Sequence, residues 1–155
     1  MPYVIEGLDP APYIALYERS DAELVGRGAM RFAVDAQPGY PCRVTLSDVE
    51  QGGSVILTNH VSRSGDTPYR ASHAIFVREG ASEAARYEDE VPPVFGPRVL
   101  SLRGFDEAGM MVDARLSQPG AADADLRALF ANPSISEIDV HNAVRGCFSA
   151  RALRV

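Results

Sequence analysis

Lysine and tryptophan are absent from this 155-residue sequence, and only two cysteines and three histidines are present. The fifteen basic residues are therefore all arginine. Without lysine the chain cannot form a Schiff base with a carbonyl substrate or with pyridoxal phosphate. It also lacks the lysine of a phosphate-binding P-loop. These absences exclude two large classes of enzyme chemistry.

Positive charge is in the minority as well, because 21 acidic residues give a formal net charge of −6. A surface that binds nucleic acid through its phosphates needs the opposite balance. The longest apolar runs have about four residues, whereas a membrane helix needs roughly twenty. The first residues lack the basic opening and the apolar stretch of a signal peptide. We therefore expect a cytoplasmic protein that has neither nucleic acid nor a membrane as its partner.

The composition is that of a folded protein, with 46% hydrophobic and 23% charged residues. The length fits one domain of ordinary size. Because no internal repeat or change of composition divides the chain, residues 1–155 are predicted to form a single globular domain.

Local patterns at the start of the chain predict two short helices. Asp9 followed by Pro10 is a typical helix start, and apolar residues behind it favour a helix over residues 10–18. Ser20 and Glu23 have the spacing of a capping box, which predicts a second helix. A strand over about residues 29–35 should follow.

The middle of the chain is predicted to be β-structure. Short strands are expected over residues 43–46, 55–61 and 72–78. The apolar run 74–77 does not alternate with polar residues, which is typical of a strand covered on both faces. Three prolines favour an irregular stretch over residues 79–97.

The clearest local signal is a hairpin, in which residues 99–104 and 110–117 flank a five-residue loop. The second arm alternates apolar and polar residues, as a half-buried strand does. A helix near residue 125 and strands over residues 137–141 and 148–152 complete the chain. Seven or eight strands and about three short helices predict an α+β fold with a largely antiparallel sheet.

The densest group of chemically useful side chains lies between a loop and a predicted strand. Tyr69, Arg70, Ser72 and His73 combine an anion-binding guanidinium with a group that titrates near neutral pH. The group favours a ligand-binding site. The structural alternative is that His73 satisfies buried polar groups and Arg70 forms a salt bridge.

A second group joins the last two predicted strands and includes Asn142, Arg145 and Cys147. An arginine near a cysteine favours the reactive thiolate, so Cys147 is a candidate nucleophile. Cys42, which also precedes an arginine, is another. Either cysteine could instead be a small buried hydrophobic residue.

Metal and cofactor sites are not expected. No two of the cysteines and histidines have the short spacing of a structural zinc site. Dinucleotide-binding, nucleophile-elbow and metalloprotease motifs are absent.

Four segments together resemble a bacterial family called domain of unknown function 1203. They are GLDP at 7–10, GYPCR at 39–43, PYRASHAIFVRE at 68–79 and NAVRGC at 142–147. The resemblance implies a bacterial single-domain protein, and it implies no activity.

Three functional hypotheses follow. The first is a pocket for a small polar or anionic molecule, formed by residues 69–73 and 142–147. The second is an interaction or homo-oligomeric module that uses Val94 and Phe95 as an exposed contact surface. The third is a cysteine-dependent enzyme.

Overall fold

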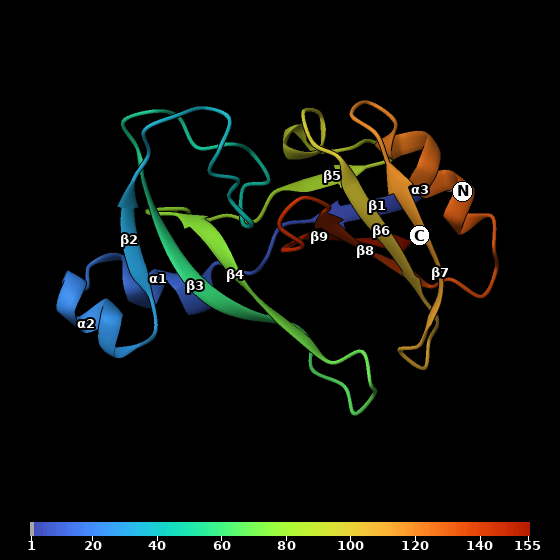
Figure 1. Cartoon of the computed structure of the whole chain (residues 1–155), viewed down its shortest axis with the longest axis horizontal. Helices are drawn as coiled ribbons and strands as arrows, with labels where there is room; N and C mark the ends of the chain where they lie inside the picture. The colour runs from blue at the N-terminus through green and yellow to red at the C-terminus, as the bar shows by residue number, and fades with distance from the viewer. Residues whose placement is uncertain (1) are drawn as a thin grey trace.

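The computed structural model describes residues 2–155, which form two antiparallel β-sheets lying side by side (Figure 1). The larger sheet has six strands in the order β5-β1-β9-β8-β6-β7. Their bounds are β5 Arg86–Glu88, β1 Tyr3–Glu6, β9 Phe148–Arg154, β8 Glu137–Asn142, β6 Leu100–Phe105 and β7 Met111–Ser117.

One face of the six-stranded sheet packs against helix α3 (Ala122–Phe130) and a 3-10 turn (Pro93–Phe95). Leu126, Leu129 and Phe130 are spaced so that they share one side of α3, and all three are buried. They contact strand residues such as Leu102 and Val140, which are fully buried. This core belongs to the larger sheet alone.

The smaller sheet has the order β2-β3-β4, with β2 Met30–Ala33, β3 Ser54–Arg63 and β4 Ala71–Arg78. Helices α1 (Ala11–Tyr17) and α2 (Asp21–Gly26) lie beside it (Figure 1). The predicted capping box at Ser20 and Glu23 is present at the start of α2. The smaller sheet has its own buried residues, among them Val55, Ile75 and Val77.

The prediction of an α+β fold with antiparallel sheets is confirmed, although residues 2–155 contain nine strands rather than seven or eight. β1 and β5 were not predicted. β1 pairs with β9 and β5, far away in the sequence, so that its short run becomes a strand only through tertiary partners. No helix in residues 2–155 is long and apolar enough to cross a membrane.

Four local predictions are wrong. The second arm of the predicted hairpin is not half-buried, because Val112, Ala114 and Leu116 of β7 are exposed. Residues 43–46 form turns rather than a strand, and Leu46 has a φ of 54° that a strand does not allow. Ala74 is exposed and Phe76 is only partly buried, because they point to the face of β4 opposite the buried Ile75 and Val77, and that face is not covered. Val94 and Phe95 are each 1% exposed, which excludes them as a contact surface.

Charged side chains join the two sheets. Asp139 of β8 is 1% exposed and accepts hydrogen bonds from Arg63 of β3 and from Arg151 of β9, both at 2.6 Å. Arg63 also pairs with Glu137 at 2.8 Å, and Arg151 donates to the carbonyl of Ser62. A single buried carboxylate thus holds one arginine from each sheet.

Replacing Asp139 by Ala should lower the free energy of unfolding by about 3–5 kcal/mol, because it leaves two largely desolvated guanidinium groups without their shared anion. Glu50→Ala is the matched control, because the Glu50 side chain is 54% exposed and a solvated ion pair such as its pair with Arg78 contributes little to stability. Urea unfolding measures both. Equal losses in the two variants would contradict a special role for Asp139.

Candidate functional site

A pocket of about 700 Å³ opens where the two sheets meet. Its lining comes from four parts of the chain: the loop 39–43, strands β3 and β4, residues 97–99, and the turn between β8 and β9. The lining residues are Gly39, Pro41, Arg43, Leu57, His73, Ala74, Phe76, Pro97, Arg98, Val99, Asn142, Val144, Arg145 and Cys147.

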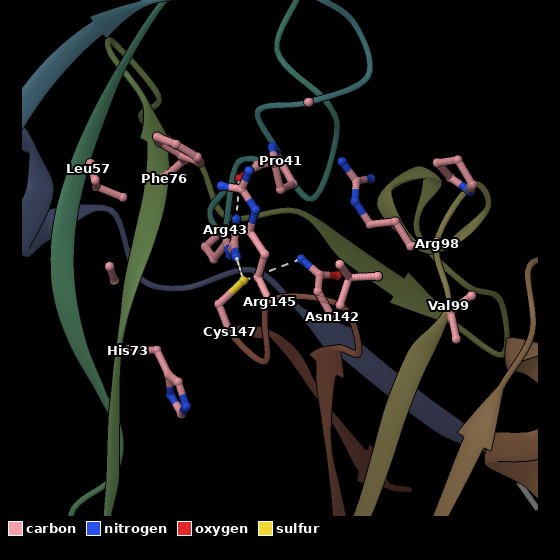
Figure 2. Close-up of a pocket in the computed structure, with 14 residues that line it drawn as sticks. Pro41, Arg43, Leu57, His73, Phe76, Arg98, Val99, Asn142, Arg145 and Cys147 are labelled. Carbon is pink, nitrogen blue, oxygen red and sulfur yellow. Dashed lines mark hydrogen bonds between the residues drawn. The ribbon is translucent and has the colours of Figure 1, made fainter.

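Two sides of the pocket differ in chemistry. In Figure 2, Leu57 and Phe76 project from the strands of the smaller sheet. Phe76 is fixed there by Tyr40, whose ring lies 5.2 Å away, and by the edge of Phe32. Arg98 lies on the opposite side, and Asn142 comes from the end of β8 (Figure 2). An apolar surface therefore faces a polar and cationic one.

Arg43 is the most constrained cation of the pocket, since it is only 2% exposed. Its guanidinium donates to the carbonyls of Pro41 (2.7 Å) and Phe148 (2.9 Å) and to Cys147 Sγ (3.1 Å). None of these acceptors is a carboxylate. Burial lowers the pKa of Arg43, as expected for a cation removed from water.

The other two arginines of the lining differ from each other. Arg98 forms a two-pronged pair with Asp48, at 2.6 and 2.9 Å, and also donates to the carbonyl of Val94. Arg145 is exposed and has no hydrogen-bond or ion-pair partner in residues 2–155. The lining contains no aspartate or glutamate. Positive charge in the pocket is therefore only partly balanced.

Cys147 begins the approach to β9 and faces the pocket (Figure 2). Its sulfur accepts from Arg43 and from the Asn142 side-chain amide at 3.6 Å. No histidine is hydrogen-bonded to it in the described residues. Cys42 differs, since it is fully buried with its sulfur accepting from the backbone N–H groups of Thr45 and Arg78. Both cysteines are free thiols.

All three histidines gather beside the pocket, between the sheets. His73 of β4 and His141 of β8 have ring centroids 5.0 Å apart, while His60 and His141 both lie against Phe148. His141 Nδ1 carries its proton, because it donates to the carbonyl of Gly146 at 2.9 Å. Burial lowers the pKa of His60 and His73, and that of His141 falls to about 4. The cluster is neutral near pH 7.

The structure brings together four of the seven residues proposed from the sequence. His73, Asn142, Arg145 and Cys147 all line the pocket. The other three do not. Tyr69 packs its ring against Phe105, while Arg70 and Ser72 are exposed at the far end of β4.

Sequence reasoning missed the pocket's buried and proline-flanked residues. Arg43 was noted as the neighbour of a candidate cysteine, as the start of a predicted strand and for its family resemblance, and not as a residue of the site. Arg98 stands directly after the stretch 79–97 that was expected to be irregular, and nothing near it signals a site. Within residues 2–155, no group of three histidine, cysteine, aspartate or glutamate side chains could hold a metal ion.

Fold and site define a class: an α+β protein in which two antiparallel sheets enclose an arginine-lined pocket. The profile of a family described as a protein of unknown function, DUF1203, matches residues 39–154, and the chain belongs to this family. That match confirms the resemblance noted above. Comparison with curated proteins and with solved structures gives no match.

The histidine cluster predicts acid sensitivity. A histidine whose pKa is about 4 when folded and 6.5 when unfolded binds its proton more tightly in the unfolded chain. Stability is therefore full above pH 6.5 and falls by about 3 kcal/mol as the pH decreases towards 4. In His141→Gln this contribution should disappear. Urea unfolding from pH 7 to pH 4 measures it as the difference between the two proteins, and parallel pH profiles would contradict it.

The two cysteines should differ in reactivity. Iodoacetamide should alkylate Cys147 in the folded protein, because this residue lines the pocket, whereas Cys42 should react only after unfolding. Mass spectrometry of the labelled peptides distinguishes them, and Cys147→Ser should remove the fast reaction. Equal rates for both thiols would show that the pocket is not open to the reagent.

Proposed function

We propose that the pocket binds a small organic anion that also has an apolar part. The observation that carries this proposal is the composition of the lining, which includes three arginines and no carboxylate. In a chain with a net charge of −6, this is a local excess of positive charge. Guanidinium groups bind carboxylates and phosphates through two parallel hydrogen bonds.

Arg145 is the residue best suited to meet the ligand. It is exposed, lines the pocket and has no partner in the described residues, so binding an anion would not break an existing pair. Arg43, which is buried at the inner side of the pocket, would attract the anion electrostatically. A buried guanidinium surrounded only by uncharged acceptors is costly, and a nearby anion would offset part of that cost.

The apolar side of the pocket favours an organic anion over a bare inorganic one. Leu57, Ala74 and Phe76 present a surface that water solvates poorly. Two polar atoms of the lining, His73 Nδ1 and Asn142 Oδ1, are buried without a hydrogen-bond partner. A ligand with a donor group near its anionic end would suit them.

A cysteine-dependent reaction is the second candidate. It rests on the position of Cys147, whose sulfur lies in the pocket next to the Arg43 guanidinium. A bound organic anion with an electrophilic carbon would then lie within reach of a nucleophile. Cys42 is fully buried and outside the pocket lining, so this alternative depends on Cys147 alone.

The binding proposal is tested with phenylacetate and hexanoate, their uncharged amides, and inorganic phosphate. The two acids should raise the melting temperature in a thermal-shift assay, and their amides should not. Arg145→Ala should weaken binding of the acids by about 10- to 100-fold, the value of one charge-assisted interaction. Isothermal titration calorimetry gives the affinities.

Arg70→Ala is the matched control, because Arg70 is also exposed and unpaired in the described residues but lies outside the pocket. It should leave both affinity and stability unchanged. Equal losses in the two variants would indicate a general charge effect and contradict the proposal. Amides that bind as well as the acids would also contradict it.

A further inference from the structure

Strand β7 is a free edge of the larger sheet. It is seven residues long, and five consecutive residues in it are exposed. Of the other sheet edges, β5 has three residues and β2 has four. The edge of β4 is partly covered by the loop 42–43, whose backbone bridges to Phe76. Natural sheets usually protect long edges, and β7 has no proline; its protection consists of the charged Asp113 and Arg115 and a β-bulge at Val112.

The backbone groups of β7 that face outward follow from the sheet itself. The N–H of Ala143 donates to the carbonyl of Val99, the residue just before β6. Because backbone groups alternate in direction along a strand, the odd-numbered residues of β6 bond to β8. Even-numbered residues of β6 therefore bond to β7, and they lie opposite its odd-numbered ones. A register shift between Gly104 and Phe105 leaves Val112 as the extra residue of a β-bulge, so this alternation applies from Asp113 to Ser117. Within that range Ala114 and Leu116 point their N–H and C=O groups away from the sheet.

Ala114 agrees with this alternation. Its N–H donates to the side chain of Asp113 at 2.8 Å rather than to β6. In the isolated chain the carboxylate of Asp113 thus accepts the outward-facing N–H group at the middle of this edge.

The sequence of β7, MVDARLS, is complementary to itself. When two copies run antiparallel about a two-fold axis through Ala114, Asp113 of each copy lies opposite Arg115 of the other. Val112 likewise lies opposite Leu116. These pairs have opposite charge on one face and apolar side chains on the other, the two combinations that stabilise neighbouring strands.

Other two-fold registers are less favourable. An axis through Asp113 sets two aspartates directly opposite, and an axis through Arg115 sets two arginines opposite. Like charges at opposed positions are destabilising. Moving the axis further leaves part of the strand unpaired. Among the registers that align the outward-facing groups, the one through Ala114 pairs the full strand without a repulsive contact.

We propose that β7 pairs with β7 of a second copy about a two-fold axis through Ala114, forming a homodimer. The two six-stranded sheets then become one continuous sheet of twelve strands. In each copy the Ala114 N–H exchanges Asp113 for the facing Ala114 carbonyl, which frees the carboxylate for Arg115 of the second copy. Pairing covers Val112 and Leu116, which are 42% and 61% exposed in the single chain. Residue Asp125 of α3, 3.1 Å from Arg115, holds that guanidinium on the charged face.

Sedimentation velocity from low micromolar to several hundred micromolar tests the proposal. The unmodified protein should show a reversible monomer–dimer equilibrium. Asp113→Arg and Arg115→Asp should each be monomeric, because each sets like charges opposite one another. An equimolar mixture of these two variants should form a heterodimer, since both facing pairs are then complementary.

Three controls accompany these variants. Glu83→Arg and Arg27→Asp make the same charge changes at exposed positions away from β7, and they should leave the dimer intact. Ala114→Pro should abolish the dimer while preserving the fold, because the N–H that it removes faces outward. Circular dichroism verifies folding.

A wild-type protein that is monomeric throughout, or a mixture that remains monomeric, would overturn the proposal. Neither outcome bears on ligand binding, because β7 does not line the pocket.

Discussion

The position of the pocket depends on one buried guanidinium. The loop 39–49 contributes no strand to either sheet, and Arg43 attaches it to the start of β9 through the Phe148 carbonyl and Cys147. The same side chain holds the carbonyl of Pro41, at the opposite end of the loop's turn. Loop, turn and strand meet around a single cation, and the space left beside it is the pocket. Because that cation has no carboxylate partner, the side chain that ties the loop to β9 is also a buried charge without a counterion.

Much of the contact between the two sheets is polar, and this explains why a polar pocket lies there. Each sheet has a separate apolar core, one under α3 and one beside α1. Between the sheets lie the Asp139 ion pairs and the histidine cluster. Buried polar groups need hydrogen-bond partners at fixed distances and directions, and some do not find one, as the unsatisfied nitrogen of His73 shows. An interface of this kind leaves room for a ligand where an apolar core would close.

Local signals explain what the sequence could predict. The hairpin of β6 and β7 and the capping box of α2 depend on residues within twenty positions of each other, and both were predicted. β1 depends on β9, at the other end of the chain, and it was missed. Residues 43–46 alternate like a strand, yet the buried Arg43 and the left-handed Leu46 belong to turns. At the site, Asn142, Arg145 and Cys147 lie within six residues, at the end of β8 and in the connection to β9, and all three line the pocket. Arg70 and His73 were separated because Arg70 lies in the loop before β4, outside the pocket, whereas His73 lies within the strand that lines it.

The use of arginine as the only basic residue fits the way these side chains hydrogen-bond to several segments of the chain. Arg43 reaches three acceptors from three different nitrogens. Arg154 reaches the carbonyls of Phe130, Asn132 and Ile135 through one terminal nitrogen, and its Nε donates to Ile135 as well. Arg31 joins two backbone carbonyls and two carboxylates. A planar fork with fixed donor directions can tie several segments of irregular chain at once, whereas an ammonium is a compact point charge. Much of this fold consists of loops that no strand pairing holds, and arginine is the cation whose geometry can hold them.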